Sequence, residues 1–271
     1  MVALSPALSS PPLHPALWRA HQLGHASPGQ AAGCPSGFAE LDAQLPGGGW
    51  PVRSLTELLL PHAGIGELRL LAPALAALQR AQRPLMWFDP PALPCAWALA
   101  SLGLSVQRLT VVRSRVALRS ASARARLPAA DVLWALAQAL DSGQLGAALA
   151  WLPARLPADA LRRLQLAAQG HGGPVFLLRD AALRQQPSAA PLRLLLASAG
   201  PDRLRVGLLK RRGPPQAQPL TLALRPVLPA ALLPALLPAL GPSAPAWAQA
   251  RARLSAGPTL PVQPSDQAAW A

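Results

Sequence analysis

Residues 57–68 read Glu57-Leu-Leu-Leu-Pro-His-Ala-Gly-Ile-Gly-Glu-Leu68, a pattern typical of a strand that runs through a tight loop into a helix. A phosphate-binding loop has the pattern Gly-x-x-x-x-Gly-Lys-[Ser/Thr], in which the lysine reaches the phosphates and the hydroxyl binds Mg²⁺. Gly66 matches the second glycine, but Pro61 stands at the first. Glu67 and Leu68 replace the lysine and the hydroxyl residue. Because a carboxylate repels a triphosphate, the stretch predicts a nucleotide-binding fold that is used for something other than hydrolysis.

Strand and helix periods alternate on both sides of this loop. Such alternation predicts an α/β fold with a mostly parallel sheet flanked by helices. The turn Gly200-Pro201-Asp202 predicts an antiparallel hairpin at the sheet edge. The predicted strands are 54–60, 85–88, 108–112, 147–152, 175–179, 192–198, 204–209 and 220–224, and the predicted helices are 66–80, with a kink at Pro73, 94–102, 129–141 and 158–169.

The chain divides into three regions by composition. Residues 1–35 form an N-terminal arm with a short helix over 13–23 and a Gly/Pro-rich linker, and residues 36–225 form the core domain. Residues 226–271 are rich in Ala and Pro, so we expect a disordered tail or one that orders only on a partner. Leu17, Trp18 and Leu23 are the apolar anchors of the arm, which either packs back on the core or binds a partner protein.

The net charge of +14 over 271 residues favours a polyanionic partner such as DNA. The charge is almost all arginine, and the chain has one Lys, one Ile, no Asn and no Tyr. That bias is typical of a GC-rich genome, so the choice of Arg over Lys carries little functional information. The charge itself still attracts nucleic acid at low salt.

The densest basic cluster is Lys210-Arg211-Arg212, with Arg203 and Arg205 just before it. On a hairpin edge, these side chains could contact phosphates without reading the base sequence. They could equally be solvated charges that keep an edge strand from pairing with another sheet. The only lysine of the chain lies here, which favours the nucleic-acid interpretation.

Other catalytic or metal chemistry has little support in the sequence. Cys34 and Cys95 are too few for a disulfide framework or a zinc site, and the five histidines are scattered. We therefore expect no catalytic residue, no metal and no cofactor. The most apolar tract, 228–240, is short and interrupted by prolines, so we expect no membrane span and a cytoplasmic protein.

The core resembles the ATPase core of the RecA recombinase, on Ser36-Gly37-Phe38, Leu41-Asp42, Gly48-Gly49 and Glu57. It is still more similar to the ImuA family, RecA-like accessory proteins of bacterial mutagenesis cassettes. That resemblance covers roughly 13–225 and is carried by Pro-Ala-Leu-Trp-Arg at 15–19, Leu-Pro-Gly-Gly-Gly-Trp-Pro at 45–51, Gly-Ile-Gly-Glu-Leu at 64–68 and Leu-Lys-Arg-Arg-Gly at 209–213. It implies a RecA-like fold and a role in SOS-induced translesion synthesis at the nucleoid. The implied partners are an ImuB-like Y-family protein and an error-prone DNA polymerase, with RecA as a further candidate partner.

The resemblance to RecA also implies where its catalytic residues would fall. Pro91 stands at the position of the catalytic glutamate, and the strand 147–152 ends without the Walker B acid. Asp180 could be the polar sensor or a helix cap. The resemblance therefore implies no ATP hydrolysis. The backbone amides of Gly64 and Gly66 could still hold a nucleotide at the helix N-terminus, or these glycines could simply close the turn.

Three functions follow from these features. The first is a catalytically silent RecA-like scaffold of a translesion polymerase complex. The second is an atypical ATPase that regulates RecA, and the third is a SulA-like inhibitor of cell division that acts by protein binding. The Lys-Arg-Arg cluster and the positive charge favour the first over the third, because a division inhibitor needs no affinity for DNA.

Overall fold

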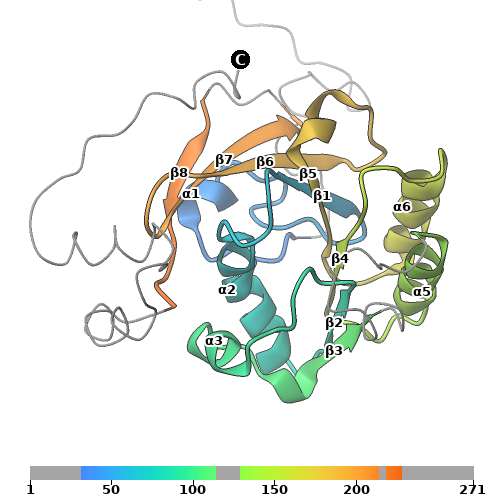
Figure 1. Cartoon of the computed structure of the whole chain (residues 1–271), viewed down its shortest axis with the longest axis horizontal. Helices are drawn as coiled ribbons and strands as arrows, with labels where there is room; N and C mark the ends of the chain where they lie inside the picture. The colour runs from blue at the N-terminus through green and yellow to red at the C-terminus, as the bar shows by residue number, and fades with distance from the viewer. Residues whose placement is uncertain (1–31, 114–128, 214–217, 228–271) are drawn as a thin grey trace, which may run out of the picture.

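The computed structural model describes residues 32–113, 129–213 and 218–227, which fold around one eight-stranded sheet (Figure 1). The strand order is β3-β2-β4-β5-β1-β6-β7-β8. The strands are β1 (Leu55–Leu60), β2 (Leu85–Phe88), β3 (Leu109–Val112), β4 (Ala147–Trp151), β5 (Val175–Asp180), β6 (Leu192–Ser198), β7 (Arg203–Lys210) and β8 (Leu220–Ala223). The helices are α1 (Ala39–Asp42), α2 (Glu67–Arg80), α3 (Ala96–Ser101), α5 (Ala129–Asp141) and α6 (Ala160–Gly170), with 3₁₀ turns η2 (Val106–Arg108) and η3 (Ala181–Gln185).

The sheet is parallel from β3 to β6, and β7 pairs antiparallel with both β6 and β8. Each parallel connection needs a crossover that returns the chain to the same end of the sheet. The long segments between strands, with α2, α5 and α6, supply such crossovers. The predicted α/β class, with a mostly parallel sheet, flanking helices and an antiparallel edge hairpin, is confirmed.

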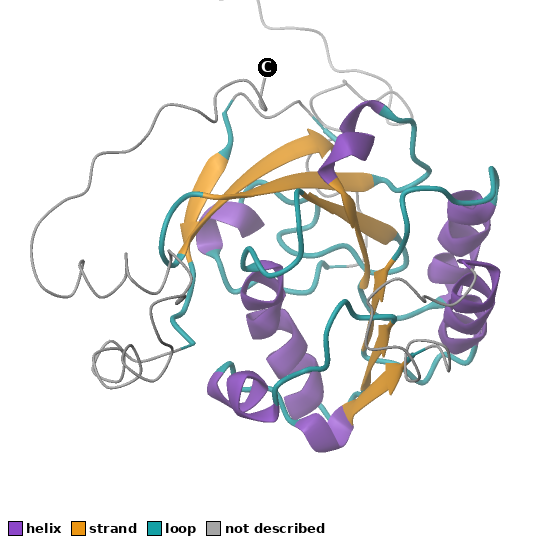
Figure 2. Ribbon diagram, viewed as in Figure 1, coloured by secondary structure: helices purple, strands orange, loops and turns teal. Residues whose placement is uncertain are grey.

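The helices cover the two faces of the sheet separately (Figure 2). One face packs against α1, α2 and α3 through a core that includes Leu71, Leu75 and Leu99, and we call it the α2 face. The other face packs against α5 and α6 through Leu136 and Leu164, and we call it the α6 face. Neither these helices nor any other in the described ranges combines the length and apolarity needed to cross a membrane.

The turn motifs at the start of the core have structural roles on the α2 face. The Ser36 amide donates to the Asp42 carboxylate at 2.9 Å, which closes the loop before α1. Gly37 has φ +86° and lies so close to Pro73 of α2 that a Cβ there would be 2.4 Å from the proline ring. Trp50 is fully buried and packs edge-on against Phe176, with 5.2 Å between ring centroids. These stretches anchor the start of the core to α2 through Gly37 and to β5 through Trp50.

The predicted strands and longer helices are present, with ends shifted by a residue or two. Helix α2 continues through Pro73, although a proline in a helix interior removes a hydrogen bond. The short elements α1, η2 and η3 were not predicted, since elements this short carry too few residues to show a period. The predicted N-terminal helix, with Leu17, Trp18 and Leu23, and the tail from 228 onward lie outside the described residues.

Candidate functional site

The loop between β1 and α2 is closed by its own carboxylate. Glu67 is the first residue of α2 and is only 3% exposed. Its Oε1 accepts a hydrogen bond from the Gly64 amide at 2.8 Å, and its Oε2 accepts one from the Gly66 amide at 3.2 Å. Gly64 and Gly66 have φ of +88° and +119°, a backbone region that favours glycine. The two glycines thereby aim their amides at one point.

Those amides are the groups with which such a loop would hold a phosphate. The N-terminus of a helix attracts anions, because its first amides lack intrahelical partners and the helix dipole is positive there. The Glu67 carboxylate is an anion in this position, supplied by the chain itself. The glutamate that seemed merely repulsive in the sequence thus occupies the anion site of the loop.

The neighbouring strand ends do not bring a set of acids to the loop. Asp89 follows β2 in a left-handed conformation, with φ 49°, and its amide donates to the Val112 carbonyl at 2.8 Å. The Asp180 carboxylate accepts the Ala182 amide at 2.8 Å, so it caps η3, one of the two roles expected for it. Leu152, directly after β4, is buried. The Asp180 side chain is therefore committed to a structural contact, Leu152 is apolar, and Asp89 is buried.

A pocket of about 400 Å³ opens beside the loop, above the carboxyl ends of β2 and β4. The carboxyl ends of the strands are where open α/β sheets bind their ligands. Its wall is mainly apolar and combines the loop, the start of α2 and the segment from Pro90 to Leu102. The large apolar residues of its lining include Trp87, Pro91, Leu93, Leu99, Trp151 and Val227.

Two tryptophans are among the residues that line this pocket. Trp87 and Trp151 stand on adjacent strands, with ring centroids 5.6 Å apart in an edge-to-face arrangement. Their indole N–H groups are buried and have no hydrogen-bond partner within the described residues. A wall of this kind suits apolar groups better than a charged nucleotide.

A buried ionic cluster lies on the α6 face beneath the loop. Glu57 of β1 is fully buried and contacts Arg179 of β5 at 2.8 Å and Arg193 of β6 at 2.5 Å. Arg179 also donates to the Ala154 carbonyl at 2.9 Å. Arg193 donates to the carbonyls of Leu183, Arg184 and Gln186 and so fixes η3. One carboxylate therefore ties together three strands and two loops.

Sequence reasoning did not find this cluster. Its signal was the presence of single charged residues inside apolar strands, at positions 57, 179 and 193. A charge in such a run is almost always paired, because burying it alone is costly. Which charges pair could not be read from the sequence, since it depends on the strand order β5-β1-β6.

The basic residues predicted to bind nucleic acid do not form one cluster in the structure. Arg205 pairs with Ala197 and Lys210 with Arg193, and directly opposed residues point to the same face of a sheet. A register shift between Arg193 and Leu194 puts Lys210 on the α6 face together with Arg203 and Arg205. The predicted residues on this face are thus spread along the whole of β7 rather than clustered.

The remaining predicted cations behave differently. Arg211 turns away and donates to the carbonyl and the side-chain oxygen of Gln44, next to α1. Lys210 donates to the Ser188 carbonyl at 2.9 Å but remains exposed. Arg212 is also exposed. The side chains of Lys210 and Arg212 are accessible to a polyanion, whereas Arg211 also holds two parts of the fold together.

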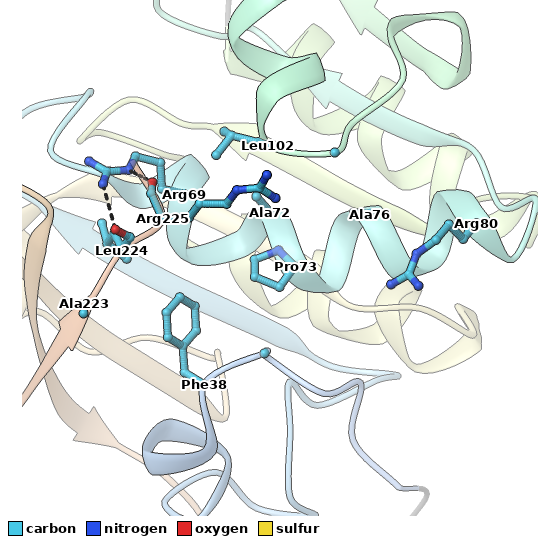
Figure 3. Close-up of a pocket in the computed structure, with 12 residues that line it drawn as sticks. Phe38, Arg69, Ala72, Pro73, Ala76, Arg80, Leu102, Ala223, Leu224 and Arg225 are labelled. Carbon is cyan, nitrogen blue, oxygen red and sulfur yellow. Dashed lines mark hydrogen bonds between the residues drawn. The ribbon is translucent and has the colours of Figure 1, made fainter. Parts of the chain in front are cut away.

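A second hollow, of about 710 Å³, runs along α2 (Figure 3). Phe38 and Pro73 form its apolar part, and Arg80 and Arg225 are exposed at its rim. Arg69 lines one end of it and is fixed, because it pairs with Asp202 and donates to the carbonyls of residues 224 and 225. Arg69 thus attaches the segment after β8 to α2.

The described residues contain no group of three or more His, Cys, Asp or Glu side chains that could hold a metal. His171 is fully buried, and burial, together with the nearby Arg83, lowers its pKa below the usual value. It is therefore a neutral core residue.

In comparisons with known proteins, no family model and no curated protein matches the chain.

Proposed function

We propose that this chain is a non-catalytic, RecA-like accessory protein of damage-induced translesion synthesis. In this role it binds an ImuB-like Y-family protein in the cytoplasm, beside the nucleoid. The proposal that the protein is non-catalytic rests on one observation: the Glu67 carboxylate accepts hydrogen bonds from the amides of Gly64 and Gly66. The proposed role in translesion synthesis and the proposed partner rest on the resemblance to the ImuA family.

Phosphoryl transfer depends on cations that neutralise the developing charge on the phosphates. In this loop the first helical residue is an acid, and its carboxylate already holds the two amides. The end of β4 carries a buried leucine where a Walker B acid would hold Mg²⁺. A nucleotide would have to displace a bound carboxylate and would then find neither the lysine nor the metal ligand. This supports a protein that works by binding other macromolecules.

The partner assignment is tested by co-purification. The tagged full-length chain is expressed with an ImuB-like protein, RecA and the division protein FtsZ, each in turn and in competition. We expect retention of the ImuB-like protein, with or without RecA, at salt concentrations that remove non-specific contacts. Selective retention of FtsZ would instead support the SulA-like alternative and refute the translesion role.

A second prediction concerns DNA. We expect the triple change Lys210→Ala, Arg211→Ala and Arg212→Ala to weaken binding to single-stranded DNA and to flatten its salt dependence. Each lost phosphate contact lowers the slope of log K against log salt by about 0.7. The expected change in slope is therefore roughly 1.4 to 2.1 for two or three lost contacts. Fluorescence anisotropy over a salt series measures it.

A matched control removes three charges elsewhere on the molecule. Arg155, Arg162 and Arg163 are exposed residues in or just before α6, away from β7. Changing these three to Ala lowers the net charge equally but should leave most of the salt slope intact. Equal slopes for the two variants would show that DNA senses only the total charge and that β7 is no binding site.

A further inference from the structure

The hollow along α2 has an arginine of that helix at each end and small side chains between them (Figure 3). The α2 residues that line it recur at helical spacing and so share one face of the helix: Arg69, Ala72, Pro73, Ala76 and Arg80. The two alanines leave room for a ligand along this face. The Cα atoms of the two arginines are about 16 Å apart, at a rise of about 1.5 Å per residue.

The hollow is positively charged at both of its ends. Arg225 stands at the Arg69 end, because the Arg69 Nε donates to its carbonyl at 2.9 Å, and Arg80 stands at the other end. Asp202 neutralises Arg69. Arg80 and Arg225 are exposed, and within the described part of the chain neither forms an ion pair. None of the described residues that line the hollow is an Asp or a Glu. The lining therefore favours a ligand with more than one negative charge.

Phe38 supplies an aromatic ring between the charged ends. It is half-buried and packs against the core of the α2 face. Figure 3 shows its ring pointing from the loop before α1 toward α2. Proteins bind single-stranded nucleic acid with this combination, in which cations follow the phosphate backbone and aromatic rings stack on bases. In a duplex the base faces cover one another, so the ring can stack only on an unpaired strand.

We propose that the hollow along α2 binds a single-stranded nucleic acid. Arg80 and Arg225 contact its phosphates, for which the planar guanidinium group is well suited, and Phe38 stacks on a base between them. A stacked strand carries one phosphate per about 3.4 Å, so several nucleotides span the hollow. A free mononucleotide would reach only one of its ends. This site goes beyond the cations of β7 and does not depend on the proposed ImuB-like partner.

The double change Arg80→Ala and Arg225→Ala in the full-length chain tests the phosphate contacts. We expect weaker binding of a labelled oligothymidylate, and a slope of log K against log salt that is flatter by about 1.4, since each contact contributes about 0.7. The control is Arg155→Ala with Arg162→Ala, which removes the same charge from exposed positions in or just before α6. Equal slopes for the two variants would overturn the proposal.

The change Phe38→Leu tests the stacking separately from the charge. Leucine keeps an apolar side chain in the wall but offers no ring to a base. We expect the affinity for oligothymidylate to fall about fivefold or more, with an unchanged salt slope because stacking involves no net charge. Binding of a duplex of the same length should not change. Urea unfolding verifies that the variant is folded, and parent affinity in a folded Phe38→Leu variant would overturn the proposal.

Competition identifies the class of ligand. Thymidine monophosphate and polyglutamate are compared with unlabelled oligothymidylate at equal concentrations of negative charge. The proposal predicts that only the oligonucleotide displaces the labelled strand efficiently. Equal displacement by the monophosphate would assign the hollow to a mononucleotide, and equal displacement by polyglutamate would assign it to an acidic peptide. Either result would overturn the proposal.

The same variants keep this site separate from the proposed function. Arg80→Ala with Arg225→Ala, and Phe38→Leu, should still retain the ImuB-like protein in co-purification while they lose affinity for the oligonucleotide. Retention of the ImuB-like protein by chains that bind DNA as the parent does would overturn the hollow as a site and leave the proposed partner intact.

Discussion

Replacing Glu57 with Gln is expected to lower the free energy of unfolding by about 3–5 kcal/mol, the largest single effect predicted for this fold. The carboxylate is fully buried and is held by Arg179 and Arg193, whose side chains are only 5% and 8% exposed. Gln has the same shape but no charge. The change therefore leaves two guanidinium groups inside the protein without the anion that offsets their desolvation.

Urea unfolding followed by tryptophan emission measures the loss, because Trp50 and Trp87 are fully buried in the fold. We expect a lower midpoint with an unchanged dependence on urea, as for a change in stability alone. The control is Glu40→Gln, the same substitution at an exposed site on α1, which should stay within about 0.5 kcal/mol of the parent. A loss below about 1 kcal/mol at Glu57 would mean that water reaches the cluster.

A double-mutant cycle separates the charge from the shape of the cluster. Arg179→Leu removes one of the two cations, and its buried Nε has no hydrogen-bond partner within the described residues. In the Glu57→Gln background this change should cost less than in the parent, because it removes a charge that has lost its anion. We expect a coupling free energy of about 1–3 kcal/mol between the two positions. Independent effects would contradict a shared ionic cluster.

The fold class could be predicted because the relevant signals are local. The run 55–60 is mainly apolar, with four leucines beside Thr56 and Glu57, as in a strand covered on both faces, and its observed burial is complete. In α2 the leucines at 71 and 75 recur at helical spacing and point into the core. Such patterns lie within single elements and do not depend on the order of the strands in the sheet.

The candidate site was harder to predict, because its contacts join residues whose partners depend on loop geometry. The sequence showed that Glu67 replaces a lysine, which indicates repulsion of phosphate. It did not show that Gly64 and Gly66 would turn their amides onto that carboxylate. The same holds for Lys210, which reaches the face of Arg203 and Arg205 through a register shift in β7. A shift of one residue moves a side chain to the opposite face of the sheet, and the hydrophobic pattern of the sequence does not reveal such a shift.

The two buried glutamates, Glu57 of β1 and Glu67 of α2, have different consequences for function. The Glu57 cluster joins three strands and η3, so it stabilises the sheet on which the loop stands. Glu67 acts within the loop itself and decides what the amides can bind. Loss of the first should destabilise the whole sheet, whereas loss of the second should cost less stability and open a binding site. This difference makes Glu67 the sharper test of the proposed non-catalytic role.

Replacing Glu67 with Ala is expected to lower the free energy of unfolding by about 1.5–3 kcal/mol, the range for hydrogen bonds to a charged group. The change leaves the amides of Gly64 and Gly66 without their acceptor at the positive end of α2. It should also create an affinity that the parent lacks. Pyrophosphate in the millimolar range should restore part of the lost stability, because the vacated amides form an anion site.

Thermal unfolding with and without pyrophosphate measures both effects. At ten times the dissociation constant, the anion should add about 1.4 kcal/mol to the Glu67→Ala variant and nothing to the parent. Glu40→Ala, a loss of the same charge in the exposed first turn of α1, controls for a general response to anions. If the parent gained as much stability as the variant, or bound ATP, the Glu67 carboxylate would not be what closes the loop. The protein would then have to be considered a nucleotide-binding one.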